Sequence, residues 1–353
     1  IGRQIGLWSD TTDGEKNIIT GPEFAALTDE EVRKRVGDLK IIARARPLDK
    51  KRLVEALQAN NEVVAVTGDG TNDAPALKAA HVGLSMGDGT SVAKEASDIT
   101  IIDNSFSSIG RAVMWGRSLY QNIQRFLLFQ LTVNVAACFL VLVGSFIGTE
   151  SPLTVTQMLW VNLIMDTFGA MALASLPPSP KVMNEKPRDR KASILTTPMT
   201  AELLGVGILF FVITLGFYCI FNATDVTSIP EMFHALPKSA DGMTPYEMTL
   251  LFSIFVWTHF FYMFNARCFE TAESVFRLKM SQGFWVIVAI IVIGQFFITE
   301  IAYEFFNCAP MLHTYDWHWN GAGALDLVII IVAASFVLWI REFYRMINRI
   351  IRK

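Results

Sequence analysis

The sequence predicts two kinds of structure in one chain: a soluble α/β domain over residues 1–115 and an all-α membrane domain over residues 116–353. Apolar residues make up 52 % of the chain and charged residues 18 %, below the roughly 25 % usual in soluble proteins. The long apolar runs all follow residue 120. Before them, strand-like and helical patterns alternate, as in a parallel sheet covered by helices.

Composition also limits the classes of function. A net charge of −3 gives no indication of a nucleic-acid partner. The four cysteines include no CxxC pair, so we expect buried or free thiols rather than a metal or disulfide framework. The chain begins at Ile1 with no signal peptide, and we expect it to be a fragment of a longer protein.

The membrane domain is expected to contain six transmembrane helices. A helix needs about 20 predominantly apolar residues to cross the hydrocarbon core. The runs that meet this condition lie at about 122–146, 153–176, 201–221, 246–264, 282–303 and 322–342. Because the number of spans is even, both ends of the chain are predicted to lie on the same side of the membrane.

Lys and Arg in the connections indicate which side that is. Basic residues concentrate in the second connection (177–200), the fourth (265–281) and the C-terminal tail. The first, third and fifth connections hold only Lys238. Since basic connections favour the cytoplasmic side, both termini and the α/β domain are predicted to be cytoplasmic.

The helical pattern of the first span begins near Ser107, well before its apolar run. One long helix, half cytoplasmic and half in the bilayer, could carry movement between the two domains. The alternative is two helices with a break between them.

Polar side chains within apolar runs are costly and are therefore candidates for function. Asn162 and Asp166 are four residues apart in LWVNLIMDTFGA and are expected to share a helix face. Asn134 lies midway along the preceding run. A carboxylate and amide oxygens from two helices suit a hard cation such as Ca²⁺. The alternative role is hydrogen bonding between neighbouring helices.

Other polar residues in the apolar runs are weaker candidates. His259 either faces the cation site or hydrogen-bonds a neighbouring helix, and the sequence does not decide between these roles. Glu300 is close to the end of a span, which favours a structural or interfacial role. Gln130, Gln157 and Thr132 are weaker still.

The α/β domain contains a candidate Mg²⁺ and phosphate site. Residues 63–66 form a predicted buried strand that leads into TGDGTNDAP, residues 67–75. Because α/β folds bind ligands at the carboxyl ends of strands, Asp69 and Asp73 are well placed for function. Two carboxylates suit Mg²⁺ bound together with phosphate oxygens.

Two further residues complete this candidate site. Asn72 can hydrogen-bond phosphate. Lys50 lies near the start of a helix predicted over 47–60 and could reach a phosphate as a point charge. The surrounding pattern also favours a parallel sheet, with further strand-like runs at 39–45, 82–87 and 98–103.

The run TGDGTNDAPALKAAHVGLSMGDGTSVAKEASDITI, residues 67–101, resembles the hinge motif of P-type ATPases. The resemblance covers essentially the whole chain, from late in the phosphorylation domain through the last six of that family's ten spans. It implies a haloacid-dehalogenase-like fold for the α/β domain. The runs MLWVNLIMDTFGAMALA (158–174) and LLFQLTVNVAA (127–137) resemble the plasma-membrane type of calcium pump.

The resemblance implies catalytic roles in the α/β domain. Lys50 matches the lysine that stabilises the phosphoryl group, and Asp69 matches the Mg²⁺-binding aspartate. Asn72 and Asp73 match the residues that complete the phosphorylation site, where Asp73 is also a possible Mg²⁺ ligand.

The resemblance also implies ligands for the transported Ca²⁺. Asn134, Asn162 and Asp166 match cation ligands of the family. His259 falls where the sarcoplasmic-reticulum type has a glutamate and the plasma-membrane type a glutamine, so it is a weaker candidate ligand.

Several features depart from the sarcoplasmic-reticulum type. Ala137 and Met165 replace its glutamate and threonine, as in the plasma-membrane type, which implies one transported calcium per cycle. No calmodulin-binding tail is present, which favours a bacterial or otherwise short-tailed relative. The DKTGT motif that carries the phosphorylated aspartate is absent, so this polypeptide alone is not expected to hydrolyse ATP.

The sequence therefore predicts part of an ATP-driven pump that moves Ca²⁺ out of the cytoplasm through an aspartyl-phosphate intermediate. ATP, Mg²⁺ and transported Ca²⁺ are the expected ligands. The expected partners are the lipid bilayer and the rest of the pump: its actuator domain, nucleotide-binding domain and first four spans. We expect a multi-pass protein of the plasma membrane. The alternatives are a pump for Na⁺, K⁺ or Mn²⁺, a non-catalytic membrane scaffold, and a phosphatase tethered to a membrane.

Overall fold

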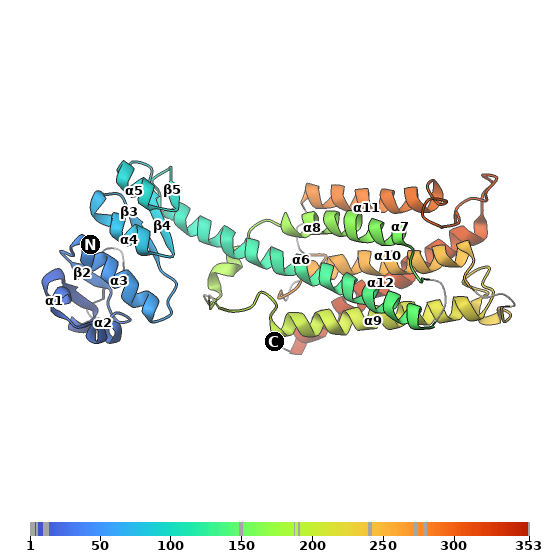
Figure 1. Cartoon of the computed structure of the whole chain (residues 1–353), viewed down its shortest axis with the longest axis horizontal. Helices are drawn as coiled ribbons and strands as arrows, with labels where there is room; N and C mark the ends of the chain where they lie inside the picture. Colours follow the sequence, from blue (N-terminus) through green and yellow to red (C-terminus); the bar gives the residue numbers. More distant parts are fainter. Residues whose placement is uncertain are drawn as a thin grey trace. The chain divides into compact units, whose positions relative to one another are not determined.

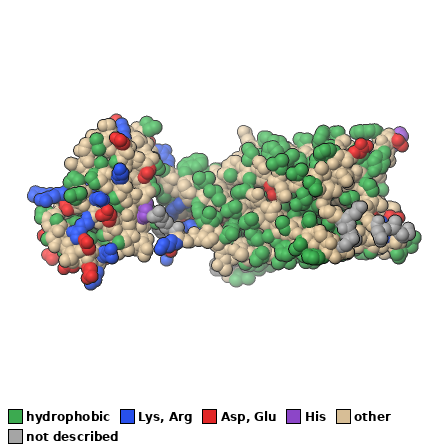
Figure 2. Space-filling view, in the orientation of Figure 1, with side chains coloured by type: hydrophobic (Ala, Val, Ile, Leu, Met, Phe, Trp, Pro, Cys, Tyr) green, Lys and Arg blue, Asp and Glu red, His purple; other side chains and the backbone are tan. Residues whose placement is uncertain are grey.

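The computed structural model describes residues 4, 6–9, 14–147, 151–186, 188–189, 191–238, 242–271, 274–277 and 281–351. The chain divides into two compact units. The soluble unit comprises Ile1–Met114 with Pro187–Lys191, and the membrane unit comprises Trp115–Lys186 with Ala192–Lys353. Figure 2 shows Lys, Arg, Asp and Glu side chains gathered on the first unit and hydrophobic side chains covering much of the second.

The soluble unit contains two small parallel sheets. One pairs β1 (Ile18–Thr20) with β2 (Ile41–Ala43), and the other has the order β3 (Ala65–Gly68), β4 (Val82–Met86), β5 (Ile99–Ile101). Its helices are α1 (Gly21–Ala26), α2 (Asp29–Arg35), α3 (Pro47–Ala59), α4 (Ala74–Ala79) and α5 (Ser91–Ala96), with short 3-10 turns η1 (Glu15–Asn17) and η2 (Thr71–Asp73) (Figure 1). The predicted α/β alternation with parallel strands is confirmed. Strand β3 begins two residues later than expected, and the prediction that it is buried is wrong, because its residues are exposed or half-buried.

Helix α3 joins the two sheets of the soluble unit. It begins at Pro47, whose fixed φ suits the first turn of a helix. Ala56 packs into the small core beside β1, which also contains Phe24 and Val32. Val54 packs into a second core with Val64 and Ala76, beside β3 and α4. This double anchorage fixes the start of α3 relative to the end of β3.

The membrane unit contains long helices that run alongside one another (Figure 1). Five helices among the described residues are long and apolar enough to cross a membrane: α6 (Phe106–Ile147), α9 (Thr197–Ala223), α10 (Pro245–Arg267), α11 (Gln282–Glu300) and α12 (Gly321–Ile351). Helix α6 is uninterrupted over its 42 residues, which confirms one long helix rather than two with a break.

The predicted span over 153–176 is present in a divided form. It consists of α7 (Val155–Leu159), a π-helical segment η3 (Trp160–Met165) and α8 (Asp166–Ala174), which follow one another without a gap. No single piece has the length of a span. The six predicted spans therefore correspond to five uninterrupted helices and this segmented one. Short 3-10 turns, η4 (Pro180–Asn184) and η5 (Met232–His234), lie in the connections.

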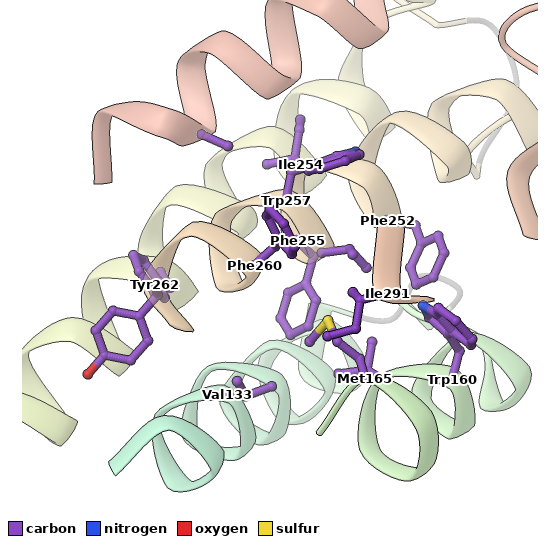
Figure 3. Close-up of a cluster of buried hydrophobic side chains, with 14 of the residues drawn as sticks. Val133, Trp160, Met165, Phe252, Ile254, Phe255, Trp257, Phe260, Tyr262 and Ile291 are labelled. Carbon is purple, nitrogen blue, oxygen red and sulfur yellow. The ribbon is translucent and has the colours of Figure 1, made fainter. Parts of the chain in front are cut away.

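Helix α10 is the most enclosed of the five. In its most apolar stretch 89 % of the residues are buried, against 28–39 % in the other four helices. It packs most extensively against α12 and also contacts α9. Its side chains Phe255, Trp257 and Phe260 belong to a buried cluster that also contains Met165 and Ile291 (Figure 3). This cluster forms the centre of the membrane unit.

Candidate functional site

The turn after β3, residues 68–73, has a tightly constrained backbone conformation. A Cβ atom at Gly68 would lie 2.4 Å from the Cβ of Asp73, so only glycine fits at that position. The carbonyl of Asp69 accepts a 2.8 Å hydrogen bond from the Thr90 amide, which ties the turn to the start of α5. The segment from Gly68 to Asp73 is therefore held in one conformation at the carboxyl end of the strand.

Lys50 and Asp73 form an ion pair in this turn. The Lys50 Nζ atom lies 2.6 Å from Asp73 Oδ1. Asp73 Oδ2 accepts hydrogen bonds from the amides of Asp69 at 3.3 Å and Gly70 at 3.2 Å. Partial burial of Asp73 opposes its ionisation, but the Lys50 ammonium and these amides outweigh that effect and lower the carboxyl pKa below its ordinary value.

Asp69 and Asn72 have exposed side chains beside this pair. Asp69 is therefore open to a metal ion, whereas both Asp73 oxygens already accept hydrogen bonds. Mg²⁺ usually takes only one or two carboxylates and completes its shell with water and phosphate oxygens. The residues present fit such a partial Mg²⁺ site, with Asp69 as the ligand and Asp73 positioning Lys50.

Asp166 is the most unusual group in the membrane unit. Its side chain is 1 % exposed. Both carboxylate oxygens are buried without a hydrogen-bond partner among the residues that the structure describes. An ionised carboxylate in such a place is strongly unfavourable unless a cation or hydrogen-bond donors compensate it. The arrangement is chemically suited to receive a positive ion.

The backbone leading to Asp166 is irregular. The Asp166 amide donates to the carbonyl of Val161, five residues earlier, at the end of the π-helical segment. Segments of this kind occur frequently at functional sites. The sequence contains no proline in this stretch and gave no signal for the irregularity.

Neighbouring helices hold the π-helical segment closely. Trp160 Nε1 donates a 3.0 Å hydrogen bond to Gln295 Oε1 on α11. A Cβ atom at Gly294 would lie 2.3 Å from the Trp160 ring, and one at Gly169 would lie 2.8 Å from the Phe129 ring. These two glycines let α11 and α6 approach the segmented helix directly, as small residues do in membrane helix interfaces.

The three predicted cation ligands lie in different environments. Asp166 is buried, Asn134 is half-buried and Asn162 is exposed. Asn162 lies in a shallow surface pocket with apolar neighbours that include Met158 and Leu163. A π-helical turn closes between residues five apart, so the four-residue spacing does not stack these side chains as it would in an α-helix. Asn162 and Asp166 therefore do not share one buried face in this chain.

His259 is fully buried among aromatic rings. Its Nδ1 lies 2.7 Å from the Phe255 carbonyl on its own helix, and its ring packs against Phe210 and Phe255. Its Nε2 is buried with no hydrogen-bond partner among the described residues. The hydrogen bond thus runs within α10 rather than to a neighbouring helix. No group of three or more His, Cys, Asp or Glu residues suited to a metal ion occurs in the described part of the chain.

Three of the weaker candidates, Glu300, Gln157 and Thr132, make structural hydrogen bonds. The Glu300 carboxylate accepts from the amides of Met311 and Leu312, Gln157 donates to the Phe306 carbonyl, and Thr132 donates to the Leu128 carbonyl. Gln295, which orients Trp160, was not among the predicted site residues. A lone amide within an apolar run was the available signal for Gln295, as it was for Asn134.

Comparison with known proteins defines the family to which the chain belongs. Residues 150–347 match the family described as "Cation transporting ATPase, C-terminus". Residues 17–81 and 50–113 match two families described as haloacid dehalogenase-like hydrolase. The chain belongs to the cation-transporting ATPase family, and it combines a haloacid-dehalogenase-like domain with a multi-pass helical membrane domain.

Similar proteins are named as calcium-transporting ATPases. The chain is 41 % identical to calcium-transporting ATPase 2 of Schizosaccharomyces pombe, over 83 % of this chain and 22 % of that protein. It is 39 % identical to plasma-membrane-type calcium-transporting ATPase 12 of Arabidopsis thaliana, over 89 % and 29 %. It is 42 % identical to plasma-membrane-type calcium-transporting ATPase 5 of Oryza sativa subsp. japonica, over 86 % and 27 %. The chain thus spans less than a third of the length of these relatives, and its expected resemblance to calcium P-type ATPases is confirmed.

Proposed function

We propose that this chain is the C-terminal part of a P-type pump that uses ATP and Mg²⁺ to export Ca²⁺ from the cytoplasm through an aspartyl-phosphate. The observation that carries the proposal is Asp166, a buried carboxylate whose two oxygens have no partner among the described residues. Similarity to proteins named as calcium-transporting ATPases supports Ca²⁺ as the ion.

The soluble unit would contribute half of the phosphorylation site. Lys50 offsets negative charge on the phosphoryl group, and Asp73 holds the Lys50 ammonium in position through the 2.6 Å ion pair. Asn72 is exposed and free to hydrogen-bond a phosphate oxygen. Asp69 would hold Mg²⁺, which supplies further charge neutralisation when bound. The nucleophilic aspartate would come from the part of the pump that precedes this chain.

The membrane unit would contribute half of the cation site. Asp166 supplies the charged ligand, and the half-buried Asn134 and the exposed Asn162 supply amide oxygens. The exposed position of Asn162 agrees with a site that is completed by spans from the rest of the pump. His259 is a secondary candidate, because its buried Nε2 has no hydrogen-bond partner in the described part of the chain.

The distribution of basic residues supports an orientation with both termini in the cytoplasm. The plasma membrane is the proposed location, since several similar proteins are named as plasma-membrane type. The remaining partners are the actuator domain, the nucleotide-binding domain and the first four spans of the same pump.

Replacing the buried carboxylate tests the proposal. In the complete pump, Asp166→Asn should abolish Ca²⁺-dependent phosphorylation by ATP, because a neutral amide cannot balance the charge of the ion. Phosphorylation by inorganic phosphate in the absence of Ca²⁺ should persist, which shows that the protein is folded. Asp225→Asn, an equivalent change at an exposed residue, serves as the control.

Normal Ca²⁺-dependent phosphorylation of Asp166→Asn would refute the proposal that Asp166 is a ligand of the cation site. Wild-type phosphorylation that responds to Na⁺, K⁺ or Mn²⁺ but not to Ca²⁺ would refute the proposal that Ca²⁺ is the transported ion. A gene that encodes no DKTGT motif upstream of this chain would leave a non-catalytic membrane scaffold as the function.

A further inference from the structure

One end of the membrane unit contains a charged pocket of about 420 Å³ that the pump mechanism does not use. It is lined by Gln121 and Arg125 of α6, by the connection between α8 and α9, and by residues at and after the end of α10. The charged side chains among the last two groups are Lys181, Glu185, Arg267 and Glu270. Its volume lies within the roughly 300–1,000 Å³ of ordinary ligand pockets.

The positive charge of this pocket is partly buried. Arg267 is 2 % exposed, with its guanidinium carbon 5.0 Å from the centroid of the Phe284 ring. Arg125 is half-buried and donates to two neutral acceptors, Asn122 Oδ1 at 3.1 Å and Gln121 Oε1 at 3.5 Å. Its Nε is buried without a hydrogen-bond partner among the described residues. Arg125 therefore retains capacity to bind an anion.

The carboxylates among the described lining residues lie at the exposed rim. Glu185 and Glu270 are both exposed, and Glu185 Oε1 accepts a 2.8 Å hydrogen bond from Gln121 Nε2. Lys181 is also exposed. The pocket thus presents guanidinium groups at its buried side and carboxylates at its mouth. This separation matches a ligand that carries an anion and a cation a few bonds apart.

The pocket lies at the level where lipid headgroups are found. Helix α10 ends at Arg267, and α8 ends at Ala174, just before the pocket residue Leu176. The ends of membrane helices mark the boundary between the hydrocarbon core and water. Basic pockets between membrane helices at this boundary are suited to lipid headgroups.

We propose that this pocket binds the headgroup of an amino-phospholipid. The phosphodiester lies against Arg125, because a guanidinium group binds phosphate oxygens with matching geometry, and Arg267 adds positive charge beside it. The ammonium group lies toward Glu185 and Glu270. The site is independent of calcium transport, since none of its residues belongs to the proposed cation or phosphorylation site.

Native mass spectrometry of the complete pump in a neutral detergent tests the site. The purified protein is offered phosphatidylethanolamine, phosphatidylserine, phosphatidylcholine or phosphatidylglycerol. We expect one retained phosphatidylethanolamine or phosphatidylserine, and weaker retention of the two lipids that lack an ammonium N–H group. Arg125→Gln should weaken retention roughly tenfold or more, as expected for the loss of charge-assisted hydrogen bonds. Lys186→Gln, an exposed lysine outside the pocket, should leave it unchanged.

A second variant and a displacement experiment test the proposal independently of Arg125→Gln. Glu270→Gln changes only the exposed rim and should remove the preference for phosphatidylethanolamine over phosphatidylglycerol, even if Arg125→Gln fails to fold. Millimolar inorganic phosphate should not displace the lipid. Retention unchanged in Arg125→Gln, an unchanged preference in Glu270→Gln, or displacement by inorganic phosphate would each overturn the proposal.

Discussion

The close contact between Gly294 of α11 and Trp160 of the π-helical segment gives a sharp prediction. In Gly294→Ala, the new Cβ atom would lie 2.3 Å from the outer edge of the Trp160 ring. Carbon atoms normally approach to about 3.5–4.0 Å, so the ring must move by more than about 1 Å. Such overpacking costs about 1–3 kcal/mol. Movement of the ring also strains the 3.0 Å hydrogen bond to Gln295, which adds about 1 kcal/mol.

We therefore expect Gly294→Ala to destabilise the pump by about 2–4 kcal/mol. The measurement is equilibrium unfolding of the complete pump in mixed micelles with increasing dodecyl sulfate. Calcium affinity should fall as well, because the displaced segment leads directly into Asp166. Gly216→Ala on α9 is the matched control, since nothing lies within 4 Å of its new Cβ atom.

A double-mutant cycle with Trp160→Phe tests whether the clash with the Trp160 ring causes the loss of stability in Gly294→Ala. Phenylalanine lacks the outer ring atoms that clash, so Gly294→Ala should cost little in that background, although Trp160→Phe alone loses the hydrogen bond to Gln295. If Gly294→Ala is as stable as Gly216→Ala, or costs the same with either side chain at position 160, the packing argument fails.

Two predictions concern titratable groups outside the membrane helices. Asp73→Asn should speed hydrogen exchange of the turn at residues 68–73, measured by mass spectrometry, because it removes the ion pair with Lys50. Since the Asp73 pKa is lowered, the difference from wild type should be complete above the ordinary value of 3.8 and vanish as the pH falls through the lowered pKa; a difference that persists in acid would contradict this. The His313 ring nitrogens lie 2.7 Å from the Thr314 carbonyl and 2.8 Å from the Glu300 carbonyl. Both hydrogen bonds can form together only when the ring is protonated, and the Thr314 carbonyl raises the His313 pKa. The stabilisation from protonated His313 is present below the ordinary pKa of 6.5 and is lost as the pH rises through the raised pKa. The unfolding midpoint should therefore fall more steeply as the pH rises above 6.5 in wild type than in His313→Gln, and parallel profiles would refute this.

The sequence was sufficient to predict the two halves of the fold, because each has a strong periodic signal. Long apolar runs identify membrane helices, and α6 begins well before its apolar run, as the helical pattern from Ser107 indicated. The turn at Asp69 and Asp73 could be predicted because glycines and a proline follow an apolar strand-like run, although β3 itself is only partly buried. The pairing of Lys50 with Asp73 could not, since it depends on how α3 packs between two sheets.

The intramembrane site was less predictable. Asp166 stands out in any apolar run, but the π-helical segment before it has no local signal. The contacts around that segment come from separate helices: Gln295 and Gly294 of α11 meet Trp160, and Phe129 of α6 meets Gly169. Counting four residues from Asn162 to Asp166 assumed a regular helix. A local rule of this kind cannot anticipate backbone geometry that distant contacts impose.

Helix α10 has a consequence for how the protein is made. Its most apolar stretch has a mean hydropathy of 1.3, against 2.0–2.5 for the other four uninterrupted helices, so it has the weakest intrinsic tendency to leave the translocon for lipid. Its main packing partner, α12, is synthesised last of the five. The newly made helix must therefore wait for a later segment before its polar side chains are shielded from the acyl chains. Substitutions on α12 that face α10 should accordingly lower the yield of inserted protein, even where they leave transport by the molecules that do assemble intact.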